Sequence, residues 1–190
     1  MRAEAGGRTV RSLTARRSRP AHTDGVKLPA PVPAGPGQES VWAYPRPPRL
    51  ERTHRHLEIW LGGQRIAATS GAYRVLETSH PPTYYLPPLA FAPGVLERAA
   101  GASTCEWKGE ATYWTVRGGA AVAVAAAWSY EAPTPAFRDM AGFVAVYAGR
   151  MDDCRVDGER VVPQPGAFYG GWITGDVVGP FKGEPGSAGW

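Results

Sequence analysis

Residues 111–130 read ATYWTVRGGAAVAVAAAWSY, and this stretch decides the fold class. Residues 111–116 and 121–130 alternate β-branched or aromatic residues with small ones, and Gly118-Gly119 separates the two runs. Paired glycines between alternating runs are typical of a tight β-hairpin turn, so a hairpin is predicted here. The many alanines would also suit a helix, but the alternating valines, the neighbouring glycines and the aromatic end favour a strand.

Further short strands are predicted on both sides of this hairpin. They share alternating apolar residues bounded by Gly, Pro or Asp-Gly turns: LEIWL (57–61), QRIAAT (64–69), AYRVLET (72–78), FVAVYAG (143–149) and the hairpin CRVDGERVV (154–162). Residues 80–88, HPPTYYLPP, are expected to be extended, because the residue before a proline avoids the α region. About seven or eight short strands with hardly any helix and no βαβ alternation predict an all-β, single compact antiparallel domain.

The charge distribution argues against a nucleic-acid-binding domain. The chain of 190 residues has a net charge of +4 and a sequence pI near 9.3. Residues 1–39 carry seven Lys or Arg against three Asp or Glu, which accounts for the whole +4. The remaining residues hold 14 basic and 14 acidic side chains and are neutral. Nucleic acid is therefore an unlikely partner, because its binding depends on a basic surface.

Residues 1–39 are predicted to be a disordered, basic, Pro/Gly/Ala-rich tail, and residues 40–190 the folded domain. The tail shows neither helical nor strand periodicity and has too little apolar surface to offset its ordering entropy. The longest apolar run, residues 120–128, is far shorter than the roughly 20 residues of a membrane span. With no apolar secretory signal at the N-terminus, the prediction is a cytoplasmic protein without membrane contact.

The two cysteines, Cys105 and Cys154, are too few for a thiolate zinc site, and no CxxC motif occurs. Reduced thiols are expected in a cytosolic protein. Asp152-Asp153 are the only adjacent carboxylates, and no Asp, Glu or His spacing nearby is typical of a metal site. We therefore expect neither a metal nor a cofactor.

Four motifs in order are similar to those of the bacterial DUF427 family, whose function is unknown. They are LETSHPPTYYLPP (76–88), TCEWKGEATYW (104–114), AAWSYEAPTP (126–135) and AGFVAVYAGRMD (141–152). The glycine-rich ending, residues 166–190, resembles that of the longer actinobacterial members, so the resemblance extends from about Ser40 to Trp190. It implies a β-tent (Mss4-like) fold without zinc knuckles and no established activity. The family is sometimes labelled nucleotidyltransferase-like, but the chain lacks the Gly-Ser and spaced-carboxylate pattern that would hold two magnesium ions.

The segment STCEWKGEATYW (103–114) concentrates the residues of a candidate ligand site. Its aromatic rings, a lysine and an adjacent glycine predict a cleft for a small flat or anionic molecule. The expected lining residues are Tyr85, Trp107, Lys108, Tyr113 and Trp128, with Arg74 and Glu77 as polar anchors. Each tryptophan could equally be a core filler, and Lys108 an ordinary solvated lysine. The later PFKG (180–183) repeats the aromatic-Lys-Gly arrangement and is a candidate for closing the same cleft.

Two other functions remain open from the sequence. Cys105 could be a nucleophile if His80 or Lys108 lowered its pKa, which would indicate a thiol-dependent enzyme. A buried and inert thiol is the alternative. The glycine-rich coda, residues 166–190, could instead bind a partner protein through Trp190, or that tryptophan could fold back over its own sheet. The sequence does not predict an oligomeric state.

Overall fold

The computed structural model describes residues 28–190. Within them the strands are β1 (Glu39–Ser40), β2 (Arg49–Thr53), β3 (Leu57–Leu61), β4 (Gln64–Thr69), β5 (Ala72–Leu76), β6 (Thr83–Tyr85), β7 (Leu96–Cys105), β8 (Gly109–Gly118), β9 (Ala121–Ser129), β10 (Val144–Val146), β11 (Asp153–Val156), β12 (Glu159–Arg160), β13 (Val162–Pro163), β14 (Trp172–Ile173) and β15 (Val177–Val178). The helical segments there are short 3-10 turns: Val41–Ala43, Pro88–Ala90, Pro135–Met140, Ala148–Arg150 and Ser187–Gly189. The predicted all-β class is confirmed.

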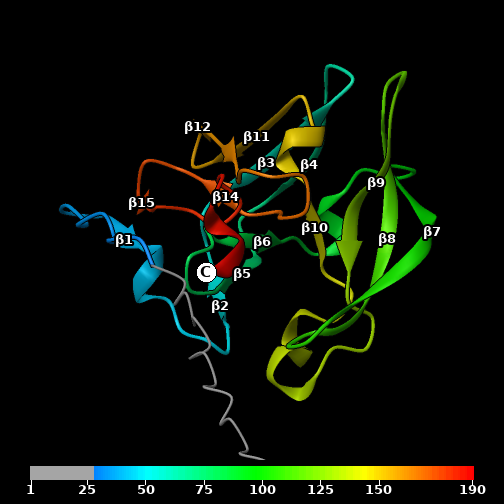
Figure 1. The fold of residues 1–190 in the computed structure, drawn as a ribbon. Coiled ribbons are helices and arrows are strands. Elements are labelled where there is room, and N and C mark those ends of the chain that lie inside the picture. Colours follow the sequence, from blue (N-terminus) through cyan, green and yellow to red (C-terminus); the bar gives the residue numbers. More distant parts are fainter. Residues whose placement is uncertain (1–27) are drawn as a thin grey trace, which may run out of the picture.

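The strands form small sheets that enclose the apolar core (Figure 1). One four-stranded sheet has the order β10-β9-β8-β7 and another β12-β11-β3-β4, while β2-β5-β6 form a three-stranded sheet. The remaining pairs are β13-β14 and β1-β15. The strands pair antiparallel, as predicted, except that β1 and β15 are parallel. No helix in the described part of the chain is long and apolar enough to cross a membrane.

Both double-glycine hairpins predicted from the sequence are confirmed, and their turns lie against each other. Gly62 and Gly63 have φ angles of 61° and 72° between β3 and β4. A Cβ on Gly62 would lie 1.9 Å from the carbonyl oxygen of Gly118, in the β8–β9 hairpin. Glycine is therefore needed here for contact between the hairpins as well as for the turn.

Two strand predictions differ from the structure. Residues 143–149 were expected to be one strand, but β10 ends at Val146 and Ala148–Arg150 form a 3-10 turn. The ten-residue β7 was missed, because LERAAGASTC has no aromatic residue and only one β-branched residue, Thr104, to indicate a strand. Antiparallel pairing with β8 holds this segment in a strand, although its composition does not favour one.

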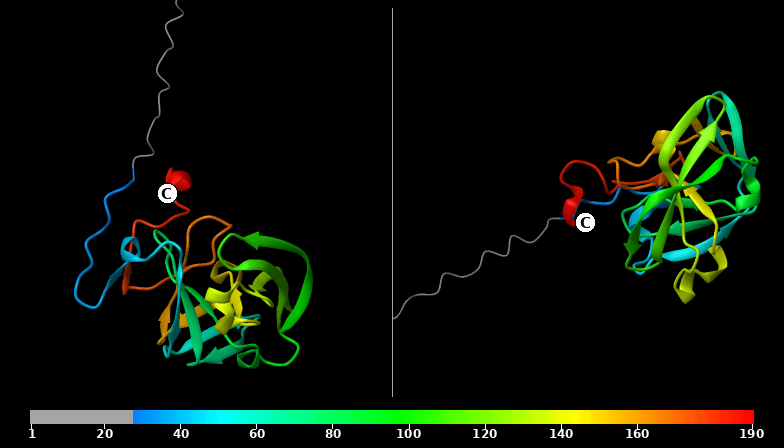
Figure 2. Two further views of the ribbon diagram at one scale, coloured as in Figure 1. Left: turned by 90° about the horizontal axis from the view of Figure 1, so that it is seen from below. Right: turned by 90° about the vertical axis from the view of Figure 1, so that its right-hand side faces the viewer.

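The folded part begins before the predicted boundary at Ser40. Glu39 pairs with Val177 in the β1–β15 ladder, and the Val32 amide donates to the Gly179 carbonyl at 2.8 Å. The structure describes residues 28–39 of the predicted disordered tail, and the prediction for residues 1–27 lies outside the described part. The N-terminal and C-terminal segments run next to each other (Figures 1 and 2), and the Trp190 ring lies 5.5 Å from that of Trp42.

Candidate ligand-binding cavity

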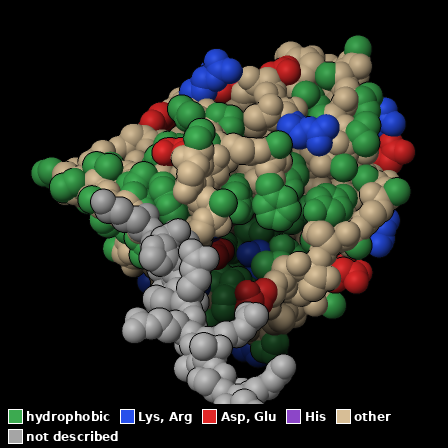
Figure 3. Space-filling model, in the orientation of Figure 1, with side chains coloured by type: hydrophobic (Ala, Val, Ile, Leu, Met, Phe, Trp, Pro, Cys, Tyr) green, Lys and Arg blue, Asp and Glu red, His purple; other side chains and the backbone are tan. Residues whose placement is uncertain are grey.

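A cavity of about 400 Å³ opens between the ends of β7 and β8 and the C-terminal coda. Figure 3 shows it as a hollow rimmed by hydrophobic side chains, with groups of both charges inside. Its lining residues are Arg46, Glu77, His80, Thr83, Tyr85, Ser103, Thr104, Cys105, Glu106, Trp107, Lys108, Ala111, Tyr113, Trp128, Tyr130, Tyr147, Gln164, Phe168, Tyr169, Gly170 and Lys182. The volume lies in the range of small-molecule sites.

A three-residue hairpin loop brings Lys108 into this cavity. Cys105, the last residue of β7, pairs with Gly109, the first residue of β8, which has a φ of 95°. Such loops need a residue in the left-handed region, which glycine adopts without strain. Thr134 fixes the loop from outside: its hydroxyl donates to the Trp107 carbonyl at 2.6 Å, and its amide donates to the Lys108 carbonyl at 3.2 Å.

The Lys108 side chain is nearly buried, and its charge has no counter-ion. The residue is 9% exposed, although lysine is almost never buried without a partner. Its Nζ lies 5.8 Å from the ring centroids of Tyr130 and Phe137. Among residues 28–190, no carboxylate forms an ion pair with it and no acceptor bonds to it. The ammonium is therefore available to an anion that enters the cavity.

One wall of the cavity is aromatic. The Trp128 ring packs against Tyr147 with 4.5 Å between centroids, and its Nε1 donates to the Tyr85 hydroxyl at 3.2 Å. Burial raises the pKa values of Tyr85 and Tyr130. Burial, with the nearby Tyr113, raises the pKa of Tyr147 to about 12. These phenols are neutral at physiological pH, so the wall offers π faces and hydroxyl groups without negative charge.

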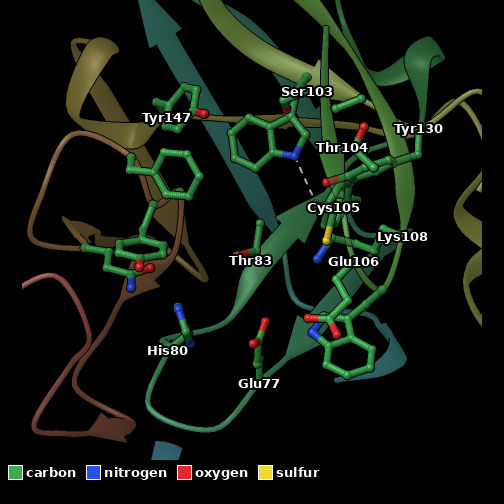
Figure 4. Close-up of a pocket in the computed structure, with 18 of the residues that line it drawn as sticks. Glu77, His80, Thr83, Ser103, Thr104, Cys105, Glu106, Lys108, Tyr130 and Tyr147 are labelled. Carbon is green, nitrogen blue, oxygen red and sulfur yellow. Dashed lines mark hydrogen bonds between the residues drawn. The ribbon is translucent and has the colours of Figure 1, made fainter. Parts of the chain in front are cut away.

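The opposite side of the cavity is formed by the turn that carries Glu77 and His80, both of which point inward (Figure 4). His80 Nδ1 lies 2.9 Å from the Thr78 carbonyl, so this nitrogen donates and Nε2 is the acceptor of the neutral ring. Burial lowers the pKa of His80 and outweighs the opposing effects of that hydrogen bond and of Glu77. Glu77 itself pairs with Arg46 at 3.2 Å.

The third side comes from the coda. The Gln164 side chain accepts from the Gly171 amide at 3.0 Å and donates to the Lys182 carbonyl at 2.9 Å, which ties two parts of the coda together. The Tyr169 ring lies 5.0 Å from the His80 ring. Lys182, in the PFKG segment, lines the cavity, and its ammonium donates to the carbonyl groups of Ala188 and Trp190.

The structure brings together all the site residues expected from the sequence except Arg74. Glu77, His80, Tyr85, Cys105, Trp107, Lys108, Tyr113 and Trp128 line the cavity. Arg74 lies outside it and binds Glu39 at 3.0 Å and Glu51 at 2.6 Å. Arg74 is therefore not placed to contact a molecule in the cavity, because Arg74 and Glu77, three apart, point to different sides.

Among the lining residues that were not predicted are three tyrosines: Tyr130, Tyr147 and Tyr169. Tyr130 is the last residue of the predicted strand 121–130 and lies on the same alternation as Trp128, and this spacing could have indicated it. Tyr147 and Tyr169 carry no such local signal, because their positions depend on long-range packing against Trp128 and His80.

The thiols of Cys105 and Cys154 are both free. Cys105 is partly exposed on the cavity wall, whereas Cys154 is buried and burial raises its pKa. Within residues 28–190, no cluster of three or more His, Cys, Asp or Glu side chains could hold a metal ion.

Fold and cavity together define an all-β domain with an aromatic, lysine-bearing cavity. The model of a domain of unknown function, DUF427, matches residues 49–157, more than half of the chain. The protein therefore belongs to the DUF427 family. No curated protein matches the sequence. Arg46 and the cavity residues of the coda lie outside the matched region, so one side of the cavity comes from segments that the family model does not cover.

Proposed function

We propose that the protein binds a small, flat, anionic molecule in this cavity. The observation that carries the proposal is the ammonium of Lys108. The residue is nearly buried and lines the cavity, its Nζ lies near the rings of Tyr130 and Phe137, and no carboxylate of the described residues pairs with it. An unpaired charge in such a place is costly, and a bound anion would offset that cost.

The aromatic wall supports a flat partner. Trp128, Tyr147 and Tyr85 line the cavity together with Lys108, and aromatic stacking suits planar molecules. On the opposite side, His80 Nε2 can accept one hydrogen bond from the same molecule. The cavity thus has an anion site, a stacking wall and an acceptor, which fit an aromatic acid better than a sugar or a peptide.

Two matched dyes test the proposal. Anilinonaphthalene sulfonate and N-phenylnaphthylamine share one aromatic skeleton, and only the first carries a negative charge. Both become fluorescent in apolar sites, so their dissociation constants are measured by titration. The wild-type protein should bind both. Lys108→Met keeps the length of the side chain and removes its charge. It should weaken the binding of the sulfonate dye at least about tenfold and leave the affinity for the neutral dye unchanged.

Arg138→Met is the matched control, because Arg138 is 81% exposed and the same unit of charge is removed away from the cavity. This variant should bind both dyes like the wild type. Equal sulfonate affinity in Lys108→Met and wild type would overturn the proposal. Native mass spectrometry of the protein after incubation with a cell extract, with Lys108→Met in parallel, then gives the mass of the natural ligand.

A further inference from the structure

The two free cysteines lie in opposite environments. Cys154 is 3% exposed, and burial raises its pKa, so its thiol is shielded and protonated. Cys105 is partly exposed and lines the cavity at the end of β7. Reactive cysteines are partly exposed and lie in electropositive surroundings. Of these two residues, only Cys105 meets the first condition.

The unpaired ammonium of Lys108 meets the second condition. Cys105 directly precedes the three-residue loop that contains Lys108, and both side chains enter the cavity from the same wall (Figure 4). Lys108 is nine-tenths buried and has no anionic partner among the described residues. The positive charge of Lys108 attracts an anionic reagent to the wall that carries Cys105.

We infer that Cys105 is a covalent modification site for electrophiles that carry an anionic group, such as unsaturated carbonyl compounds bearing a carboxylate. This inference rests on the proposed anion site at Lys108. The Cys105 thiolate would add to the activated alkene carbon, so a carbon–sulfur bond forms as the π bond opens. The adjacent carbon then takes one proton, equal to the one lost by the thiol. The addition needs no oxidant, reductant or metal.

Two maleimides that differ in charge test the inference on the full chain. N-ethylmaleimide is neutral and maleimidopropionate carries a carboxylate, so the ratio of their rates, normalised to free cysteine, reports recognition of the anion. Peptide mass spectrometry locates the adduct. The wild type should be labelled at Cys105 while Cys154 stays unlabelled, with the anionic reagent favoured by about tenfold.

Three variants test which residues the ratio of labelling rates depends on. In Lys108→Met the ratio should fall to about one, in Cys105→Ser no rapid labelling should remain, and in Cys154→Ser the wild-type ratio should persist. Because the wild-type preference is electrostatic, it should also shrink at high salt without any substitution. Labelling of Cys105 only after denaturation, or equal normalised rates in the folded wild type, would overturn the inference.

The dye titrations separate this inference from the proposed function. If the sulfonate dye binds through Lys108 while the two maleimides show equal rates, the anion site stands and the covalent site at Cys105 is wrong. If the sulfonate affinity does not depend on Lys108, the proposed function fails, and the inference built on it falls too. Where both hold, prior saturation with the sulfonate dye should slow labelling of Cys105.

Discussion

Gly170 lies directly against the indole ring of Trp128: a Cβ on this glycine would be 2.1 Å from Cη2 of the ring. The next residue, Gly171, is equally confined, with a Cβ position 2.4 Å from Oε1 of Gln164. No real Cβ fits at these distances, so the two glycines allow the coda to close on the aromatic wall. The width of the cavity therefore depends on a contact between the family domain and its coda.

Gly170→Ala should destabilise the protein by about 1–3 kcal/mol, because the added methyl group forces Trp128 or the coda backbone to move. The same shift should weaken the binding of both dyes to the cavity. Urea denaturation followed by circular dichroism measures the free energy of unfolding. Gly71→Ala is the control, since its Cβ would meet only Thr69 Oγ1, at an ordinary 3.8 Å. Equal stability of the two variants would show that the coda is not pressed against Trp128.

Lys108→Met should leave the free energy of unfolding unchanged or raise it by up to about 1 kcal/mol. The residue is already 9% exposed with its Nζ near two aromatic rings, and an apolar chain of similar length avoids the cost of the unpaired charge. The same denaturation experiment checks this outcome. A loss of more than about 2 kcal/mol would identify Lys108 as a structural residue instead.

Arg74→Met should destabilise the fold by about 1–3 kcal/mol, since it leaves the carboxylates of Glu39 and Glu51 without their shared partner. We expect a smaller loss of stability than for a fully buried ion pair, because the Glu39 and Glu51 side chains are 40% and 35% exposed. Neither dye should be affected. Arg49→Met, which removes one exposed ion pair with Glu51, should stay within about 0.5 kcal/mol of wild type.

The stability of the protein should fall as the pH drops below about 6.5, the ordinary pKa of histidine. Burial lowers the pKa of His80 in the folded state, so the unfolded chain takes up the proton first. The contribution of His80 to the free energy of unfolding is fully present above pH 6.5 and is lost as the pH falls toward the pKa of His80 in the folded state. His80→Asn, whose amide can still donate to Thr78, should reduce the difference in unfolding free energy between about pH 7.5 and pH 5.5. If His80→Asn leaves this difference in unfolding free energy unchanged, a group other than His80 causes the pH dependence.

Much of the fold follows from local patterns. The alternating runs around Gly62-Gly63 and Gly118-Gly119 predict both hairpins, because strand periodicity and turn geometry act over a few residues. Cys105, Trp107, Lys108 and Tyr113 lie close together in the segment 103–114, so their clustering at one cavity could be anticipated. The strand β7 could not, because its alanines and glycine have no strand preference of their own.

By itself, the sequence determined the all-β class, the hairpins and the residues of the cavity that lie close together along the chain. Only the tertiary structure decided that Arg74 turns away to Glu39 and Glu51, that His80 faces Lys108 across the cavity, and that the coda closes one side. Those positions depend on contacts between residues far apart in sequence, such as Gly170 with Trp128. Local residue propensities cannot predict such contacts, because the contacts form only when the sheets pack against each other.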